Sequence, residues 1–275
     1  MAYTQLIPQS TPSARVEQIS EDSSHHLLSI TSGKANEYRL AQLSDYALLS
    51  RGKFPHTSLT LKLSARVSSN NIPGTWGFGL WNDPFGMSIG FGGKPFRLPA
   101  LPNAIWFFGA SEENYLSFRN LDREDPAPAS PANGFLAQSF RSPKFHPLLV
   151  LTGLTLPFSR KLTRRLMSQV IAEDGVQLWN RGAGSRGRHQ QADRVQSVDP
   201  TDWHRYRLEW SQKHVLFEVD DVPVFESAVS PNPPLGLVIW IDNQYAAFTP
   251  KGKIGFGVLD NPEPAWLEIK ELEFS

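Results

Sequence analysis

The chain contains no cysteine among its 275 residues. This absence excludes disulfide bonds, a thiol nucleophile and any metal site built on cysteine. An excess of charge of either sign is also missing, because 27 Lys and Arg balance 27 Asp and Glu and leave a formal net charge of zero. A neutral chain has no overall field to attract a polyanion or an acidic membrane. We therefore expect no nucleic acid among its partners.

Long apolar runs are missing as well. No stretch reaches the roughly 18 residues that a membrane-spanning helix requires, so we expect no transmembrane segment. Residues 1–15 lack the basic and then apolar order of a signal peptide, which favours a cytoplasmic protein. The most apolar stretch, 148–158, precedes a basic segment. Contact with a membrane surface through residues 148–170 is therefore an alternative to packing on the protein or covering a cleft as a lid.

Patterns for metals and nucleotides are absent from the sequence. The 7 histidines include no H-x-H or H-E-x-x-H pattern, and none has a carboxylate at metal-ligand spacing. Glycines in G-F-G-L-W lie in a strand pattern and not before a helix, so they do not match a phosphate loop. We expect no metal and no cofactor.

Aromatic residues are what the chain has in excess. Its 8 Trp and 17 Phe occur with 20 Gly and 22 Pro, a composition typical of a β-sandwich with long loops. Apolar side chains alternate with polar ones through residues 204–225, and Asp220 and Asp221 mark the turn between two strands. One segment, 159–173, instead has the period of an amphipathic helix, and Gly175 is expected to end it.

These patterns predict an all-β fold with one inserted helix near 159–173, organised as a single sandwich domain over residues 1–275. We expect residues 1–14 to form a loosely ordered arm. The Pro-rich segment 120–147 is predicted as an excursion from the core, and the Gly-rich segment 180–197 as a loop.

Two local features refine the strand pattern. Asn36–Leu40 is predicted as an early strand. In the last strand, Leu267 and Ile269 do not share parity with Leu272, which predicts a bulge near Lys270–Glu271.

The run W-H-R-Y-R-L-E-W at Trp203–Trp210, followed by a V-D-D turn, resembles the C-terminal part of the glycoside hydrolase family 16 and concanavalin A-like β-sandwiches. The resemblance covers residues 55–275 and implies a two-sheet antiparallel jelly roll with a sugar-binding cleft on its concave sheet. Family members carry E-x-D-x-E on a concave strand, where two carboxylates perform retaining hydrolysis. The matching place here, Pro102–Gly109, reads P-N-A-I-W-F-F-G and holds no carboxylate. The resemblance therefore implies the fold and argues against the reaction.

Candidate ligand-binding residues follow from the parity of two strands. Leu237, Ile239 and Ile241 share an apolar face that should point into the sandwich, which leaves Trp240 on the concave face. Gly77 and Gly79 share a face with Trp81 and are expected to open space beside it. Burial of these tryptophans as core residues is the alternative. The residues expected to bind a saccharide or another partly apolar small molecule are Trp81, Trp106, Trp240, Asn243, Gln244 and Tyr245.

Three carboxylates are candidates for acid and base catalysis, namely Asp83, Glu112 and Asp242. The simpler interpretation is favoured, in which Asp83 caps a turn and Glu112 lies at a solvated hairpin tip. Three hypotheses for function remain. They are a carbohydrate-binding protein without the retaining mechanism, a diverged glycosidase, lyase or cyclase on the same fold, and a structural or interaction module.

Overall fold

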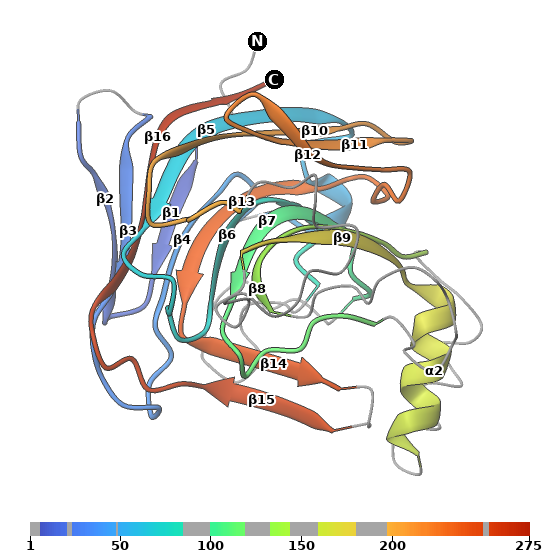
Figure 1. Cartoon of the computed structure of the whole chain (residues 1–275), viewed down its shortest axis with the longest axis horizontal. Coiled ribbons are helices and arrows are strands. Elements are labelled where there is room, and N and C mark those ends of the chain that lie inside the picture. The colour runs from blue at the N-terminus through green and yellow to red at the C-terminus, as the bar shows by residue number, and fades with distance from the viewer. Residues whose placement is uncertain are drawn as a thin grey trace.

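The structure is a computed structural model and describes residues 6–20, 24–47, 49–84, 100–118, 133–143, 159–179, 197–249 and 253–275. Two seven-stranded antiparallel sheets pack face to face, and a separate two-stranded hairpin lies against the outer side of the first sheet (Figure 1). The predicted all-β, two-sheet antiparallel sandwich is confirmed. In the described ranges no helix is long and apolar enough to cross a membrane.

The first sheet carries the candidate site. Its strands, in spatial order, are β1 (Ile7–Ser10), β4 (Leu40–Ser44), β13 (Gly236–Asp242), β6 (Thr75–Trp81), β7 (Ala104–Ala110), β8 (Gly134–Arg141) and β9 (Ala172–Trp179). Outside the second sheet, the described residues also form the hairpin β14 (Gln244–Phe248) and β15 (Ile254–Val258), the short 3-10 helix η1 (Arg51–Lys53) and the helix α2 (Arg160–Val170).

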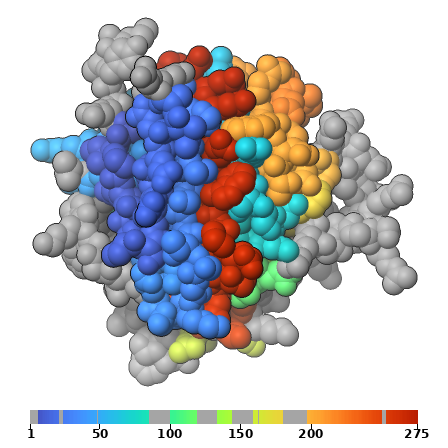
Figure 2. Space-filling model, turned by 90° about the vertical axis from the view of Figure 1, so that its left-hand side faces the viewer, coloured from blue at the N-terminus to red at the C-terminus, as the bar shows by residue number. Residues whose placement is uncertain are grey.

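The second sheet joins strands from both ends of the chain. Its order is β12 (Val222–Ser227), β11 (Val215–Val219), β10 (His204–Trp210), β5 (Leu59–Val67), β16 (Ala265–Phe274), β3 (His26–Ile30) and β2 (Ala14–Gln18). Figure 2 shows β16 in red between the blue N-terminal strands and the cyan β5. The C-terminal strand is therefore a central member of this sheet.

Apolar side chains from alternate strand positions fill the space between the sheets. On β13, Leu237, Ile239 and Ile241 are fully buried in this core, as their period of two predicted. On β10 of the facing sheet, Tyr206 and Leu208 are buried in the same cluster. Burying one such aliphatic side chain stabilises the fold by about 1.5–3 kcal/mol. A register slip of one residue would expose the whole row, so the parity of β13 is strongly fixed.

Two local predictions are confirmed. Asp220 and Asp221 have φ values of 51° and 65°, and they form the tight turn between β11 and β12. The register between β16 and β5 shifts between Lys270 and Glu273, and Glu271 has a φ of 56°. The predicted bulge therefore lies where the parity of the sequence breaks.

Several element boundaries differ from the sequence prediction. Residues 7–10, within the expected arm, form β1 and pair with β4. The predicted strand Asn36–Leu40 is wrong, because β4 begins only at Leu40. Strand β8 lies inside segment 120–147, which was predicted as an excursion. Neighbours pair with β8 on both sides and its two faces are buried, so it lacks the polar alternation that marks a half-exposed strand.

The helix is shorter than predicted. It ends at Val170, and Gly175 lies within β9 instead of ending the helix. The buried side chains of α2 include Val170 together with Thr163 and Arg164, whereas Leu166 is half-buried. The apolar stretch 148–158 and residues 180–196 of the predicted loop lie outside the described residues.

Candidate functional site

The outer face of the first sheet carries the three tryptophans predicted for ligand binding. We call this face, which bears Trp81, Trp106 and Trp240, the concave face. The three side chains are 7%, 3% and 4% exposed. They belong to a second apolar cluster, separate from the core between the sheets. The predicted parity is therefore correct, although the tryptophans are covered and do not lie in an open groove.

A cavity of about 70 Å³ lies among these tryptophans and beneath the hairpin. We call it the concave cavity. Its walls also include four side chains from β13 and the hairpin. These are Asp242, Gln244, Tyr245 and Phe256.

The tryptophan rings pack tightly on one another. Trp81 and Trp240 are stacked, with centroids 5.7 Å apart and planes at 9°. Trp106 lies 6.0 Å from Trp81 and 5.8 Å from Trp240. The indole N–H groups already have acceptors: Trp81 donates to the Tyr46 hydroxyl at 2.6 Å and Trp240 to Thr75 Oγ1 at 3.0 Å. A ligand would therefore meet ring faces and edges and not the N–H groups of these two rings.

The glycines of β6 do not open space for a ligand, which corrects the prediction for Gly77 and Gly79. Gly77 is the cross-strand partner of Trp240, and a Cβ at this position would lie 2.8 Å from Cη2 of that ring. A Cβ on Gly79 would lie 2.6 Å from the Cα of Trp106. Each glycine instead leaves room for a tryptophan residue of an adjacent strand. The glycines at these positions therefore serve packing and not ligand binding.

Asp242 is the carboxylate of the concave cavity. Its Oδ1 accepts hydrogen bonds from the Thr75 hydroxyl at 2.7 Å and from the Gln244 backbone at 3.2 Å. Its Oδ2 accepts one from the Tyr38 hydroxyl at 3.2 Å. Burial raises the pKa of Asp242 from 3.8 to about 7, although these hydrogen bonds favour the ionised form. The group can therefore exchange a proton near neutral pH.

Tyr38 and Gln42 are two of the cavity residues that the sequence interpretation missed. Burial, together with the negative charge of Asp242, raises the pKa of Tyr38 well above its usual value, so Tyr38 stays protonated and donates its hydrogen bond. Gln42 is 1% exposed and lines the cavity, yet its Oε1 accepts no hydrogen bond. Parity within β4 could have placed Gln42 on the concave face, but that strand was predicted four residues too early, as Asn36–Leu40.

The hairpin β14–β15 covers the cavity and pairs with neither large sheet. Contacts with other described residues hold it in place. The Tyr115 backbone donates to the Ala246 carbonyl at 2.9 Å, and the Phe248 backbone donates to the Tyr115 carbonyl at 3.2 Å. Arg164 of α2 donates to the Phe248 carbonyl, and to that of Ser117 at 2.7 Å. These acceptors explain why this charged residue of α2 is buried.

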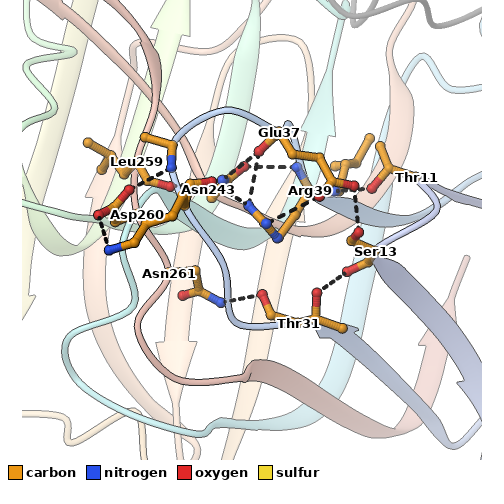
Figure 3. A network of polar contacts seen from close by, with 12 residues as sticks. Thr11, Ser13, Thr31, Glu37, Arg39, Asn243, Leu259, Asp260 and Asn261 are labelled. Atoms are coloured by element: carbon orange, nitrogen blue, oxygen red, sulfur yellow. Dashed lines mark hydrogen bonds and ion pairs between the residues drawn. The ribbon is translucent and has the colours of Figure 1, made fainter.

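Asn243 fixes the base of the hairpin and does not line the concave cavity. Its side-chain amide donates to the carbonyls of Glu37 at 3.0 Å and Leu259 at 2.9 Å, and its Oδ1 accepts from the Arg39 backbone at 2.9 Å. Figure 3 shows this network, which continues through the ion pair between Arg39 and Glu37 to Ser13. The hairpin is therefore anchored at its base by Asn243 and along its length by the contacts of Tyr115 and Arg164.

The other two candidate carboxylates do not line the concave cavity. Asp83 follows β6, is fully buried and has a φ of 49°, and its carbonyl accepts from the Arg51 guanidinium at 3.2 Å. Glu112 is exposed in the turn after β7 and lines a different cavity. Within the described residues, no three His, Asp or Glu side chains gather as metal ligands.

Comparison with solved structures finds similar folds. A glycoside hydrolase family 16 endo-glucanase from Bacteroides ovatus is 10% identical, with a TM-score of 0.48, over 100% of this chain and 96% of that one. An endo-β-1,4-glucuronan lyase from Trichoderma reesei is 11% identical, with a TM-score of 0.48, over 98% and 90%. A legume lectin-like domain from Entamoeba histolytica is 11% identical, with a TM-score of 0.43, over 98% and 89%.

The similarity between this chain and these solved structures concerns the fold alone. No protein-family model matches the chain, and no curated protein matches it. Similarity this low carries no conclusion about activity or ligand. Function must therefore be argued from the residues of the site.

Proposed function

We propose that the protein binds a saccharide in the concave cavity, between the three tryptophans and the hairpin, without cutting it by a two-carboxylate mechanism. Flat rings such as Trp81 and Trp240 offer apolar surface to the faces of a sugar. The observation that carries the proposal is the unsatisfied Oε1 of Gln42 in the wall of this cavity. A buried acceptor without a donor costs about 1–3 kcal/mol. A sugar hydroxyl would supply the missing donor.

Entry of a sugar ring requires the hairpin to move. The cavity of about 70 Å³ is less than half the roughly 150 Å³ that holds a benzene molecule in an apolar protein interior. The hairpin is the element that we propose to move, because it belongs to neither large sheet, whereas the strands that carry the three tryptophans are paired within the first sheet. Its base would remain fixed by Asn243.

The site lacks the pair of acids that most glycosidases use. Hydrolysis by that route needs two carboxyl groups about 5 to 9.5 Å apart on either side of the scissile bond. Among the described residues that line the concave cavity, Asp242 is the only carboxylate. This favours binding over hydrolysis.

A disulfide that locks the hairpin tests the proposal. Tyr115 and Ala247 pair in an isolated parallel bridge, and neighbouring strands lie about 4.8 Å apart, within the Cα range of a disulfide. In the double variant Tyr115→Cys with Ala247→Cys, oxidation should weaken oligosaccharide binding by more than about tenfold, because the open state is lost. Reduction should restore it. Isothermal titration calorimetry with a panel of neutral and uronic-acid oligosaccharides measures both states.

A matched lock within the hairpin is the control. A Cβ built on Gly255 lies 3.9 Å from the Cβ of Ala247, close to the usual disulfide separation of about 3.8 Å. Oxidised Ala247→Cys with Gly255→Cys should bind as tightly as its own reduced form, since this disulfide ties the hairpin only to itself and the contact of the new Cβ with Tyr245 is the same in both forms. The wild-type chain has no cysteine, so its affinity should be the same with and without reductant. Equal affinity of the oxidised and reduced Tyr115→Cys, Ala247→Cys variant would refute a moving hairpin.

One observation favours a second candidate function, an enzyme that transfers a proton. The pKa of Asp242 near 7, with Tyr38 hydrogen-bonded to it, suits a general acid or base at neutral pH. Hydrolysis or elimination of an oligosaccharide by the wild type, lost in Asp242→Asn while binding persists, would support this function. Binding by the wild type without any product would exclude it for that ligand.

A further inference from the structure

Asp242 is a buried carboxyl group without a cation beside it. Hydrogen bonds from Thr75, Tyr38 and the Gln244 backbone favour its ionised form, and all of these donors are neutral. Among the described residues that line the concave cavity, there is no lysine, arginine or histidine. A buried charge in a protein is ordinarily paired with an opposite one. The ionised carboxylate therefore lacks a counter-ion that the described part of the site does not supply.

The side chain of Asp242 forms part of the cavity wall. Its Oδ2 accepts a hydrogen bond from the Tyr38 hydroxyl at 3.2 Å, and a carboxylate oxygen has lone pairs for a second donor. Attraction between opposite charges also acts without contact and is strong where water is excluded. The volume of about 70 Å³ is several times the roughly 15 Å³ that one water molecule needs. An ammonium group therefore fits in this cavity even when the hairpin is closed.

Aromatic rings form much of the remaining wall and decide which kind of cation fits. They are those of Trp81, Trp106, Phe108, Trp240, Tyr245 and Phe256. The face of an aromatic ring attracts a cation, most strongly where both are shielded from water. A metal ion would instead need several oxygen ligands. A uronic acid would bring a second negative charge close to Asp242, which is unfavourable. The wall therefore matches an organic ammonium group.

We propose that the concave cavity selects amino sugars, which carry a protonated amine, over neutral sugars and uronic acids. The ammonium group lies among the aromatic rings near Asp242, and the sugar ring follows once the hairpin has moved. This inference rests on the proposed saccharide binding and names the class of sugar.

Sugars that differ in one group test this selection on the wild-type chain. Methyl glycosides of glucose, galactose and mannose are each compared as the 2-hydroxy, the 2-amino and the uronic acid form. The tryptophan indole N–H signals are followed by NMR at about pH 6.5, where an ordinary amine is charged. For the hexose that the site accepts, the 2-amino form should bind about tenfold more tightly than the 2-hydroxy form. The uronic acid form should bind most weakly.

Replacing Asp242 with asparagine removes the negative charge and keeps the size of the side chain. The ratio of affinities between the 2-amino and 2-hydroxy forms should fall at least threefold in this variant, because only the rings then attract the cation. Glu112→Gln is the control, since Glu112 is an exposed carboxylate that does not line the concave cavity. Its ratio should equal that of the wild type.

Binding of a cation should also depend on pH. An ammonium group nearby favours the ionised form of Asp242, whose pKa is about 7 in the free site, so binding below pH 7 releases a proton. The other titratable side chains in the described wall are Tyr38 and Tyr245, and β4, β6 and β7 contribute none. From about pH 5 to 6.5 the affinity of the wild type for the 2-amino form should rise, and Asp242→Asn should show no such rise.

Each outcome separates this inference from the proposed function. Equal affinities of the wild type for the 2-amino and 2-hydroxy forms would overturn the selection and leave saccharide binding in place. Tightest binding of a uronic acid form would do the same. A preference for the 2-amino form that is unchanged in Asp242→Asn would overturn the role of this carboxylate. If no sugar of any form shifts the indole signals of Trp81 and Trp240, both the selection and the proposed function fail.

Discussion

Replacing Gly77 with alanine is expected to lower the free energy of unfolding by about 3 kcal/mol. The added Cβ would meet the backbone carbonyl of Phe107 and would lie 2.8 Å from Cη2 of Trp240. Neither neighbour can yield cheaply, because the carbonyl belongs to the paired strand β7 and the ring is stacked on Trp81. Urea denaturation followed by circular dichroism measures the loss.

Gly52→Ala is the control for this substitution. Gly52 lies in η1, and a Cβ there would meet no atom within 4 Å. We expect its free energy of unfolding to stay within about 0.5 kcal/mol of the wild type. A Gly77→Ala variant as stable as Gly52→Ala would mean that Trp240 does not lie against β6, and the tight arrangement of the concave face would be wrong.

Replacing Asp242 with asparagine is expected to change how stability depends on pH. The pKa of Asp242 is about 7 in the folded chain and about 3.9 in an unfolded one. The folded state therefore keeps a proton that the unfolded state releases between these values, and the contribution of this group is full below about pH 4 and is lost as pH rises to 7. That loss is on the order of 4 kcal/mol for a fully buried group. Asp242→Asn removes the titrating group, so its stability should fall less over this range.

Thermal unfolding of both proteins at acidic and slightly alkaline pH measures the difference. As pH rises, the free energy of unfolding of the variant should fall less than that of the wild type. The difference between the two should change by a few kcal/mol. Asp202→Asn, at an exposed residue, should follow the wild-type profile. Parallel profiles for Asp242→Asn and wild type would show that the Asp242 carboxyl is solvated, and the covered cavity would then be excluded.

The sandwich could be predicted because most of its strands have one face in a core. Parity placed Leu237 and Ile241 inside and Trp240 outside, and it located the bulge near Lys270–Glu271. Strand β8 escaped notice because both of its faces are buried. Alternation carries no information for a strand of that kind.

The covering of the site could not be predicted from alternation. A period of two tells which face a side chain occupies, but it does not tell what lies on top of that face. Closure of the concave cavity depends on long-range contacts such as those of Arg164 with Phe248 and Ser117. A charged residue on a helix is ordinarily solvated. Only the register of paired strands shows that Gly77 faces Trp240.

The most direct test of saccharide binding on the concave face is a two-dimensional NMR spectrum of the 8 tryptophan indole N–H groups, recorded while an oligosaccharide is added. Single Trp→Phe variants assign the signals. We expect the signals of Trp81, Trp106 and Trp240 to shift together, in proportion to ligand bound, while that of Trp210 in the core between the sheets stays in place. If no oligosaccharide of the panel moves these three signals, the concave face is a second core and not a binding site.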